Sequence, residues 1–599
     1  MSKVASLAPH VVLGPLPPFV LKILREAVKD PSNLDLSAVE ATLRHKLMPF
    51  QEDGVRFAIA HGGRCMIADD MGLGKTFQAL AVASYYRHNW PLLIVTTSSM
   101  RETWQSKIHE LLPSVPLMNI VTLTSSKDAQ LVADKQTEVV IVSYKITTMH
   151  TDLLKNKNFG FVIIDESHYL KSHKAQCTIA LSGVTRRVAR CVLLSGTPAL
   201  SRPGELFTQL SLIEPRLMPS FTEYGKRYCN GKQTSFGWDM TGQSNLAELQ
   251  VILQKRFLIR RTKEQVLTKL EGKTRETVLL DQTLLQFSKE DEAGLSHAAE
   301  TYKRTKAAEK HSALITYFSE TARVKIPAIC KYIRELVRES SEKFLVFAHH
   351  RCVIDAICSE LDEAAVHYIS IVGSTPANSR AELVDKFQHG TVRCCVLSVT
   401  AANSGITLTA AALVLFAELH WNPGILTQAE SRAHRIGQQG AVRVRYLLAN
   451  GTADDHMWPM LQGKLNVLNN VGLSKDTFED TAIKHQESKN HITQYLTPPR
   501  VLKNKNDYIP GTNIRKESYT KASSSTQTND ELSTKSSFEN NFNKIDSISS
   551  SEQCLATNDI TSLNSDVKKE TDECDFSDFF EKSFFDDDDD DELLAKIDL

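Results

Sequence analysis

Short apolar runs, each bounded by polar or glycine-containing turns, recur along this chain and constrain its fold more than any other feature. The runs are LLIVTT, VVIVSY, FVIIDE, CVLLSGT, FLVFAHH, CCVLSVT, ALVLFAE and VRVRYLL. Helix-like stretches such as TFQALAVASYYR and IPAICKYIRELVRES lie between several of them. Near-continuous apolar strands that alternate with helices are typical of a parallel sheet covered on both faces.

The runs fall into two groups, at about residues 60–200 and 340–450, so the sequence predicts two α/β lobes. The polar stretch between the groups is rich in Lys, Glu, Gln and Ala, which indicates helices. Near the end the chain loses periodicity and fills with Ser, Thr, Asn, Lys and Asp, which indicates disorder. The predicted domains are a lead segment at 1–45, lobe 1 at 46–204, a helical insertion at 205–323, lobe 2 at 324–480 and a disordered acidic tail at 481–599.

The net charge of −1 hides an asymmetry between the body and the tail. Residues 481–599 carry 14 basic and 24 acidic side chains, against 56 and 47 in the rest of the chain. A basic body with an acidic tail favours a polyanion as partner of the body and a separate partner for the tail, although plain solubility explains the charges equally well. The 11 cysteines have no metal-ligand spacing, which predicts reduced thiols in a cytosolic or nuclear protein.

The segment CMIADDMGLGKTFQAL has the strand, turn and helix of a phosphate-binding loop. A strict loop reads G-x-x-x-x-G-K-[ST], and Asp69 stands where the first glycine is expected. The amides from Gly72 through Gly74 to Thr76 are predicted to face an anion at the helix N-terminus. Lys75 is predicted to reach the β- and γ-phosphates, and the Thr76 hydroxyl to bind Mg²⁺. A glycine-rich turn without a ligand is the alternative.

Two further segments favour a nucleotide site. FVIIDESH ends an apolar strand with Asp165, predicted to hold Mg²⁺, and Glu166, predicted to polarise the attacking water. QAESRAHRIGQ contains Gln428, Arg432 and Arg435, and the two arginines, three residues apart, are predicted to share a helical face. Two guanidiniums on one face suit a γ-phosphate in the transition state. The alternatives are a solvated acidic loop and a basic surface helix.

These segments occur together with LMPFQEDGVRFA, LIVTTSS, LSGTPA and VLSVTAANSGITLTAAALVLFAELHWNP. The set resembles the Swi/Snf-type double-stranded DNA translocases of helicase superfamily 2, over about residues 15–480. It is most similar to the HARP (HepA-related protein) annealing helicases. The resemblance implies two RecA-like lobes, ATP and Mg²⁺ as cofactors, and a nuclear DNA-dependent ATPase. It also implies action on duplex or branched DNA, where the protein rewinds strands and remodels stalled replication forks.

The resemblance assigns roles position by position. Gln51 matches the glutamine that reads adenine. Gly72, Gly74, Lys75 and Thr76 correspond to the phosphate and Mg²⁺ ligands, Asp165 and Glu166 to the DESH box, and Gln428, Arg432 and Arg435 to the γ-phosphate sensor. Residues that couple hydrolysis to lobe movement or shape the cleft are Ser195, Thr197, Gly405 and Trp421, although Trp421 is equally compatible with a core aromatic. Contacts to the phosphates of the tracked strand are Ser98, Ser99, Thr400 and Asn403.

The sequence departs from the family pattern in several places. Asp69 is not one of them, because family loops typically read D-E-M-G-L-G-K-T. Thr97, Val372 and Ser431 stand where the family usually has Pro, Asp and Asp. None of the three is a predicted nucleotide ligand, so we expect ATPase activity to survive. The lead segment is too short for the HARP modules and the replication protein A motif that relatives carry. Either the chain lacks the fork targeting and annealing of those relatives, or it is a truncated version.

The tail ends in DECDFSDFFEKSFFDDDDDDELLAKIDL, where phenylalanines punctuate an acidic run. Residues 572–599 are predicted to dock into a basic, apolar groove, with replication protein A as the leading candidate partner. The alternatives are a tail that covers the basic body of its own chain and a tail that only solubilises. For the whole protein, the alternatives to an annealing helicase are a nucleosome remodeller and a DNA-bound scaffold that no longer turns over ATP.

Overall fold

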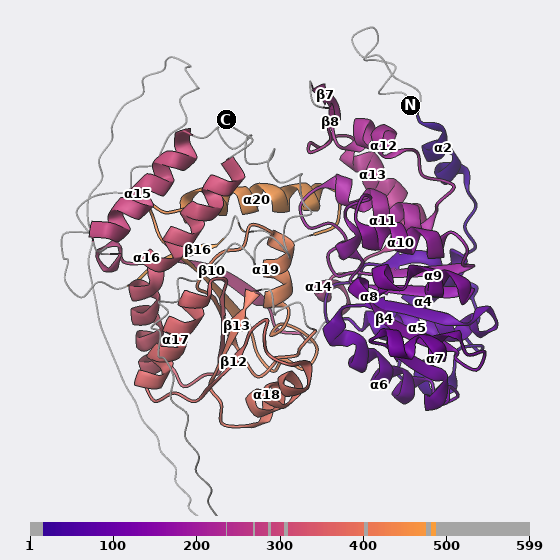
Figure 1. Cartoon of the computed structure of the whole chain (residues 1–599), viewed down its shortest axis with the longest axis horizontal. Coiled ribbons are helices and arrows are strands. Elements are labelled where there is room, and N and C mark those ends of the chain that lie inside the picture. The colour runs from indigo at the N-terminus through magenta and orange to yellow at the C-terminus, as the bar shows by residue number, and fades with distance from the viewer. Residues whose placement is uncertain are drawn as a thin grey trace, which may run out of the picture. The chain divides into compact units, whose positions relative to one another are not determined.

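The computed structural model describes residues 16–234, 237–267, 270–285, 289–304, 310–399, 405–474, 478 and 481–486. These residues form two α/β lobes, each built on a seven-stranded sheet (Figure 1). Neighbouring strands are parallel throughout both sheets. The predicted α/β class with two parallel-sheet lobes is therefore confirmed.

The sheet of lobe 1 has the strand order β3-β4-β2-β5-β6-β1-β9. Its strands are β1 (Arg64–Ile67), β2 (Leu92–Thr96), β3 (Ile120–Leu123), β4 (Val139–Ser143), β5 (Phe161–Asp165), β6 (Arg190–Leu194) and β9 (Leu258–Ile259). Successive side chains enter two separate cores, as Leu93 and Ile94 of β2 do. Burial on both faces explains why the central strands are continuous apolar runs.

Helices cover both faces of this sheet. On one face, α4 (Pro49–Ala60), α5 (Lys75–Tyr85) and α6 (Arg101–Leu111) supply Leu80 and Trp104 to the core. On the other face lie α10 (Gln176–Thr185) and α11 (Leu206–Ile213). The smaller helices of this lobe are α2 (Pro18–Arg25), α3 (Ala41–Arg44), α7 (Ala129–Ala133), α8 (Tyr144–Met149), α9 (Thr151–Asn156), α12 (Phe221–Tyr228) and α13 (Leu246–Ile252).

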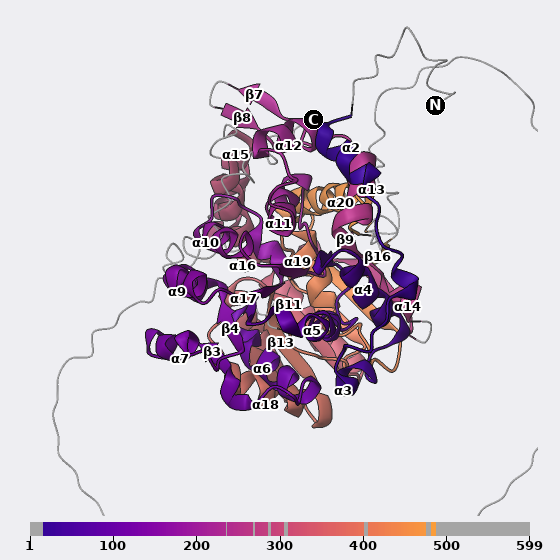
Figure 2. The ribbon, with the colours of Figure 1, turned by 90° about the vertical axis from the view of Figure 1, so that its right-hand side faces the viewer.

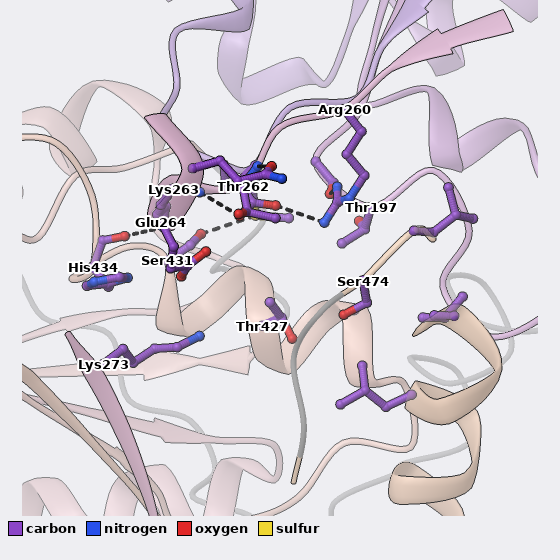
Figure 3. A pocket seen from close by; sticks show the side chains of 18 of the residues that line it. Thr197, Arg260, Thr262, Lys263, Glu264, Lys273, Thr427, Ser431, His434 and Ser474 are labelled. Atoms are coloured by element: carbon purple, nitrogen blue, oxygen red, sulfur yellow. Dashed lines mark hydrogen bonds and ion pairs between the residues drawn. The ribbon is translucent and has the colours of Figure 1, made fainter. Parts of the chain in front are cut away.

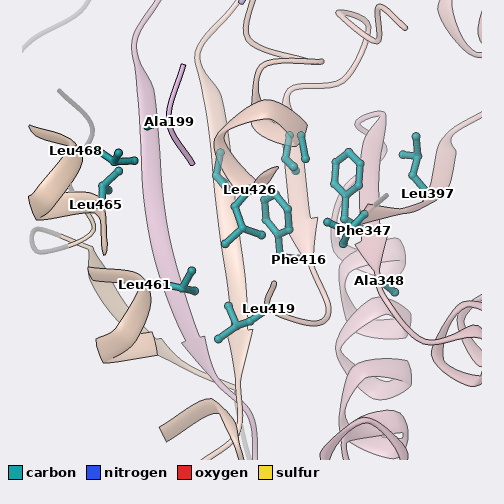
Figure 4. Close-up of a cluster of buried hydrophobic side chains, with 14 of the residues drawn as sticks. Ala199, Phe347, Ala348, Leu397, Phe416, Leu419, Leu426, Leu461, Leu465 and Leu468 are labelled. Atoms are coloured by element: carbon teal, nitrogen blue, oxygen red, sulfur yellow. The ribbon is translucent and has the colours of Figure 1, made fainter. Parts of the chain in front are cut away.

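The sheet of lobe 2 has the strand order β12-β13-β11-β14-β15-β10-β16. Its strands are β10 (Lys273–Leu279), β11 (Phe344–Ala348), β12 (Tyr368–Ile371), β13 (Cys394–Ser398), β14 (Leu413–Phe416), β15 (Val442–Leu448) and β16 (Ala482–His485). Phe347 stacks on Phe416 with ring centroids 5.3 Å apart, and Leu426, Leu461 and Leu465 extend the same core (Figure 4). Helix α14 (Lys263–Val266) lies in the connection from β9 to this lobe. The helices of the lobe are α15 (Lys289–Arg304), α16 (Lys310–Glu339), α17 (Arg351–Glu363), α18 (Ala377–His389), α19 (Pro423–Glu430) and α20 (Asp454–Asn470).

The predicted helical insertion at 205–323 is mainly helical, but it also contains strands. The antiparallel hairpin of β7 (Lys232–Thr234) and β8 (Gly237–Asp239) lies beyond α12 in both whole-chain views (Figures 1 and 2). Within the same stretch, β9 completes the sheet of lobe 1 and β10 belongs to the sheet of lobe 2. Residues 205–323 thus contribute to both lobes, a division that the sequence pattern did not reveal.

The predicted tail also begins with structure, because β16 pairs with β10 at the edge of the second sheet. Residues 487–599, including the acidic-aromatic segment at 572–599, lie outside the described residues, and so do residues 1–15. Among the helices that the structure describes, none has the length and apolar character to cross a membrane.

Candidate active site

The carboxyl ends of the strands of lobe 1 carry most of the predicted site residues, as expected for an open parallel sheet. The loop after β1 holds two glycines in the left-handed backbone region, Gly72 with φ of +86° and Gly74 with φ of +74°. This conformation favours glycine, and here the close neighbours also require it. A Cβ at Gly74 would lie 2.4 Å from Gln51 Nε2, and one at Gly72 would lie 2.8 Å from Arg435 Cβ. The loop therefore brings Gln51 and Arg435 to its two sides.

Lys75 and Gln51 both bond to the phosphate-binding loop itself. Lys75 Nζ donates to the Asp69 carbonyl at 2.9 Å. Gln51 Nε2 donates to the Leu73 carbonyl at 3.0 Å, while its Oε1 accepts from the Met48 amide at 2.9 Å. Burial lowers the pKa of Lys75, and the neighbouring carboxylates, Glu166 foremost, oppose that shift. The ammonium is thus held between the loop and the acidic pair.

Asp69, which stands in place of the first glycine, is completely buried. Its carboxylate accepts hydrogen bonds from Gln78 Nε2 at 2.8 Å, from the Arg261 amide at 3.0 Å and from Arg261 Nε at 2.9 Å. Asp69 therefore fixes the loop to the chain that leaves β9, a role that no glycine can perform. The sequence analysis missed Arg261, for which the only signal was an Arg-Arg pair after a short apolar segment.

The acidic pair lies at the end of β5, as predicted. Thr96 Oγ1 and Trp104 Nε1 donate to Asp165 Oδ2, at 3.0 Å and 2.8 Å. Burial, assisted by the neighbouring carboxylate of Glu166, raises the pKa of Asp165 to about 6. Burial also raises the pKa of Glu166, against the opposing charges of Lys75 and Arg432. Two half-buried carboxylates side by side form a site where a divalent cation would relieve their repulsion.

A chain of polar contacts joins the acidic pair to the SGTP segment after β6. Glu166 Oε2 lies 3.4 Å from His168 Nδ1, which lies 3.2 Å from Ser195 Oγ. Ser195 Oγ in turn accepts from the Thr197 amide at 3.1 Å. Burial lowers the pKa of His168 to about 4, so its imidazole is neutral at physiological pH. The predicted coupling residues Ser195 and Thr197 are thus connected to Glu166 by a single histidine.

The prediction that Arg432 and Arg435 share a helical face is wrong. Helix α19 ends at Glu430, and both arginines lie in the turns that follow. After Glu430 the Arg432 amide bonds only three residues back, to the Ala429 carbonyl at 3.1 Å, and Ser431 Oγ donates to the Gln428 carbonyl at 2.7 Å. The two arginines do lie in one short segment, as the sequence predicted, but that segment consists of turns and not of a helix.

Several polar atoms of this region are buried without a hydrogen-bond partner in the described part of the chain: Gln428 Oε1 and Nε2, Arg432 Nε and Glu166 Oε2. Burial lowers the pKa of Arg432 to about 10, and the charge of Glu166 opposes the shift. Buried polar groups in folded proteins are nearly always satisfied. The amide and the guanidinium can donate to an anionic ligand, whereas the carboxylate oxygen can accept from water or hold a cation.

The predicted DNA contacts are placed only in part. Ser98 is exposed and Ser99 half-buried in the turn Ser98–Met100 after β2. Gly405, with φ of +74°, approaches this turn so closely that a Cβ would lie 2.2 Å from Met100 Sδ. Thr400 and Asn403 lie outside the described residues.

Trp421 is half-buried rather than exposed. Its ring lies 4.9 Å from that of His420 and 5.9 Å from that of Phe318. It therefore packs as a partly buried aromatic at the carboxyl end of β14, and a coupling role for it stays a prediction.

Two parallel-sheet lobes with a phosphate-binding loop, an acidic pair and a pair of arginines define a Swi/Snf-type protein of helicase superfamily 2. Residues 50–324 match the SNF2-related domain, and residues 324–437 match the helicase conserved C-terminal domain. The chain belongs to the family of the SWI/SNF-related matrix-associated actin-dependent regulator of chromatin subfamily A-like protein 1. The Caenorhabditis elegans homologue of that protein is 42% identical over 80% of this chain and 69% of its own length. The resemblance drawn from the sequence is confirmed.

Two other relatives are similar over much of the chain. The Drosophila melanogaster protein of the same name is 46% identical over 82% of this chain and 65% of its own length. Human "DNA annealing helicase and endonuclease ZRANB3" is 42% identical over 71% of this chain and 40% of its own length. The chain thus spans less than two thirds of several curated relatives that it matches, including those from Drosophila and Xenopus.

Proposed function

We propose that this chain is a nuclear, ATP-dependent DNA translocase that acts as an annealing helicase, rewinding DNA and remodelling stalled replication forks. One observation carries the proposal: among the described residues, buried polar atoms of Gln428 and Arg432 have no hydrogen-bond partner, and the opposing charge of Arg432 acts on Glu166 beside the phosphate-binding loop. Buried polar atoms of this kind are costly unless a ligand satisfies them, which supports the binding of nucleotide at this place. The relatives named as annealing helicases support the annealing of strands as the activity.

The residues of lobe 1 have distinct tasks in this proposal. Gln51 would read adenine, and the loop amides with Lys75 and Thr76 would hold the phosphates of ATP. Thr76 and Asp165 would hold Mg²⁺. ATP, when bound, supplies the phosphoanhydride whose hydrolysis powers movement. Glu166 Oε2 would accept a proton from the attacking water, for which its raised pKa is suited.

The residues of lobe 2 complete the site. Arg432 and Arg435 would stabilise the negative charge that grows on the transferred phosphoryl group. Their placement depends on the position of lobe 2 relative to the loop, since Gly72 and Arg435 come from different lobes. His168, Ser195 and Thr197 would pass a change at Glu166 to the segment that contacts α19, where a Cβ at Gly424 would lie 2.7 Å from Leu200.

DNA would lie across the turn Ser98–Met100 of lobe 1 and the segment around Thr400, Asn403 and Gly405 of lobe 2. Hydroxyls, amides and backbone N–H groups suit a motor that holds phosphates of any sequence. We expect binding that is indifferent to sequence and that weakens steeply with salt, because phosphate contacts release counterions.

The test is ATP hydrolysis by the full chain with forked DNA, blunt duplex, single strands, nucleosomes or no addition, together with strand annealing. The annealing substrate is two complementary strands held apart by a single-strand-binding protein. An annealing helicase hydrolyses ATP strongly with duplex-containing or forked DNA and anneals only when ATP is hydrolysed. Equal hydrolysis with and without DNA at low salt contradicts the proposal.

A chromatin remodeller is the second candidate, because the relatives' shared name includes "regulator of chromatin". The same panel of substrates separates the two. A remodeller prefers nucleosomes to naked duplex of equal length, whereas an annealing helicase prefers forks.

For the acidic tail we propose docking of residues 572–599 onto a basic groove, with replication protein A as the leading partner. Phenylalanines would supply buried area and the acidic side chains would speed encounter. Deleting 572–599 should abolish pull-down of the partner and leave DNA-stimulated hydrolysis unchanged. If deletion instead raises DNA affinity, the tail competes with DNA for its own chain. If neither property changes, the tail only aids solubility.

A further inference from the structure

The chain passes from β9 to lobe 2 through the residues Arg260, Arg261, Thr262 and Lys263. Arg261 holds Asp69, as described above. Arg260 Nη1 donates to the carbonyls of Ala68 and Gly196, at 2.9 Å and 3.0 Å. Two successive arginines therefore join this connection to the phosphate-binding loop and to the SGTP segment. None of these contacts was anticipated from the sequence.

The second aspartate of the loop is held from the same connection. Arg260 Nη2 donates to Asp70 Oδ1 at 2.8 Å, and the Lys263 backbone amide donates to Asp70 Oδ2 at 3.2 Å. Both oxygens of Asp70 thus accept from this connection. The phosphate-binding loop is therefore bonded directly to the backbone of Lys263, at the start of α14.

Lys263 also reaches lobe 2. Its side chain is buried, and its Nζ donates to the carbonyl of His434, the residue immediately before Arg435 (Figure 3). The ammonium adds to the burial that lowers the pKa of His434 to about 4. Lys263 therefore bonds through its amide to the phosphate-binding loop and through its ammonium to the segment that carries Arg435.

A cavity of about 350 Å³ lies beside this link, lined from lobe 1 by Asp70, Met71 and Thr262 and from lobe 2 by Thr427 and Ser431 (Figure 3). The Thr262 hydroxyl is buried there without a hydrogen-bond partner in the described chain. Because the cavity separates the lobes at this place, each contact that crosses it contributes more to holding the lobes together. Besides Lys263, Ser431 Oγ crosses it and lies 3.1 Å from Met71 Sδ.

We propose that Lys263 is a positioning residue, which holds Arg435 against the phosphate-binding loop and so sets how often the lobes adopt the hydrolytic arrangement. The inference rests on the proposed ATPase function but adds a residue outside the nucleotide ligands. A hydrogen bond from a charged donor contributes about 1.5–3 kcal/mol, which corresponds to about 10-fold or more in a rate that depends on it.

The variants are Lys263→Met, which keeps the apolar stem without the charge, and Lys263→Arg, which keeps a donor. Lys255→Met is the matched control, because Lys255 Nζ also donates to a main-chain carbonyl, that of Leu24, but at the surface of lobe 1. Each full-length variant is measured for ATP hydrolysis with duplex DNA, for affinity for a non-hydrolysable ATP analogue, and for thermal stability.

For Lys263→Met we expect the DNA-stimulated kcat to fall about 10-fold or more, with KM for ATP and analogue affinity within about 3-fold of wild type. Lys263→Arg should recover much of kcat, and Lys255→Met should match wild type. An unchanged kcat in Lys263→Met overturns the proposal. So does a loss of analogue affinity as large as the loss of kcat, because Lys263 would then be a nucleotide ligand.

A second readout does not depend on hydrolysis. Cysteines introduced as Met71→Cys and Ser431→Cys should form a disulfide under mild oxidation, detected as a cross-linked peptide by mass spectrometry. With Lys263→Met added, cross-linking should slow several-fold. If the wild-type chain shows no DNA-stimulated ATPase but cross-linking still depends on Lys263, the proposed function fails and the positioning role stands. Cross-linking that is indifferent to Lys263 overturns the role whatever the ATPase shows.

Discussion

At the scale of single residues, the loop after β1 shows how one position can be both unusual and necessary. Asp69 breaks the strict phosphate-loop pattern, yet its buried carboxylate is bonded by Gln78 and Arg261. The sequence identified the loop because its glycines and lysine are adjacent. It did not identify Arg261, which lies 192 residues away and meets Asp69 only in the folded chain.

Replacing Asp69 by Asn should therefore destabilise the protein without touching a phosphate ligand. Removing one partner of a buried ion pair leaves the other charge uncompensated and costs about 3–5 kcal/mol. Chemical denaturation of Asp69→Asn, with the exposed Asp53→Asn as control, measures the difference. Equal stability of the two variants would show that Arg261 finds other partners.

The nucleotide ligands give a separate prediction. Lys75→Ala should abolish hydrolysis, and Glu166→Gln should keep analogue binding while turnover stops. Arg435→Ala should lower kcat by about 10³-fold, as loss of a transition-state arginine does elsewhere. Steady-state hydrolysis with saturating duplex DNA checks all three. Turnover by Lys75→Ala within a few fold of wild type would exclude the assigned site.

At the scale of elements, the sequence predicted the strands that are buried on both faces, because such strands are continuous apolar runs. It missed the strands at and near the sheet edges. In β10 the segment KTRETVL is mostly polar, and Val278 and Thr277 alone are well buried. β10 lies next to the edge strand of its sheet, and its polar side chains hide it from a search for apolar runs. The same reason hid β16.

The edge strand β16 gives a testable difference between two shortened chains. Gln486, which follows it, is buried and donates from Nε2 to the Ala328 carbonyl at 3.1 Å while Oε1 accepts from the Asp281 amide at 3.0 Å. A chain that ends at residue 480 loses these bonds and uncovers β10. We expect it to melt several degrees lower, at about 2–4 °C per kcal/mol, than a chain that ends at residue 489. Equal melting temperatures would mean that β16 adds no stability.

At the scale of the whole molecule, the contacts between lobes were the least predictable part of the site. The segments appear in the expected order, but order does not say which atoms meet. Gly405 packs closely against Met100, and Lys263 bonds to the backbone carbonyl of His434. Both contacts join residues that lie far apart in the chain. Such contacts have no side-chain pattern in the sequence.

The buried histidines predict how stability depends on pH. Burial lowers the pKa of His168, His349 and His434 to about 4 from the ordinary 6.5. Unfolding therefore takes up protons between these values, and stability falls as pH falls from about 6.5 towards 4. Asp165, with its pKa raised to about 6, releases a proton on unfolding and offsets part of the loss.

Glu166, whose pKa burial also raises, opposes the histidines together with Asp165, so the net uptake near pH 5 is about one to two protons. The free energy of unfolding should then fall by about 1–3 kcal/mol for each pH unit of acidification near pH 5. Urea denaturation at pH 7, 6 and 5 measures this slope. The variant His349→Gln should take up about one proton fewer on unfolding, so its stability should depend less steeply on pH. A stability that stays level from pH 7 to pH 5 would contradict neutral, buried histidines.

The pairing of β9 with β1 also bears on how the protein is made. A ribosome that has translated lobe 1 as far as β6 has delivered the phosphate-binding loop but not the arginine that neutralises Asp69. The nascent chain must wait until residues 258–262 leave the exit tunnel before its first sheet can close. The first lobe is thus finished only when the connection to the second has been synthesised.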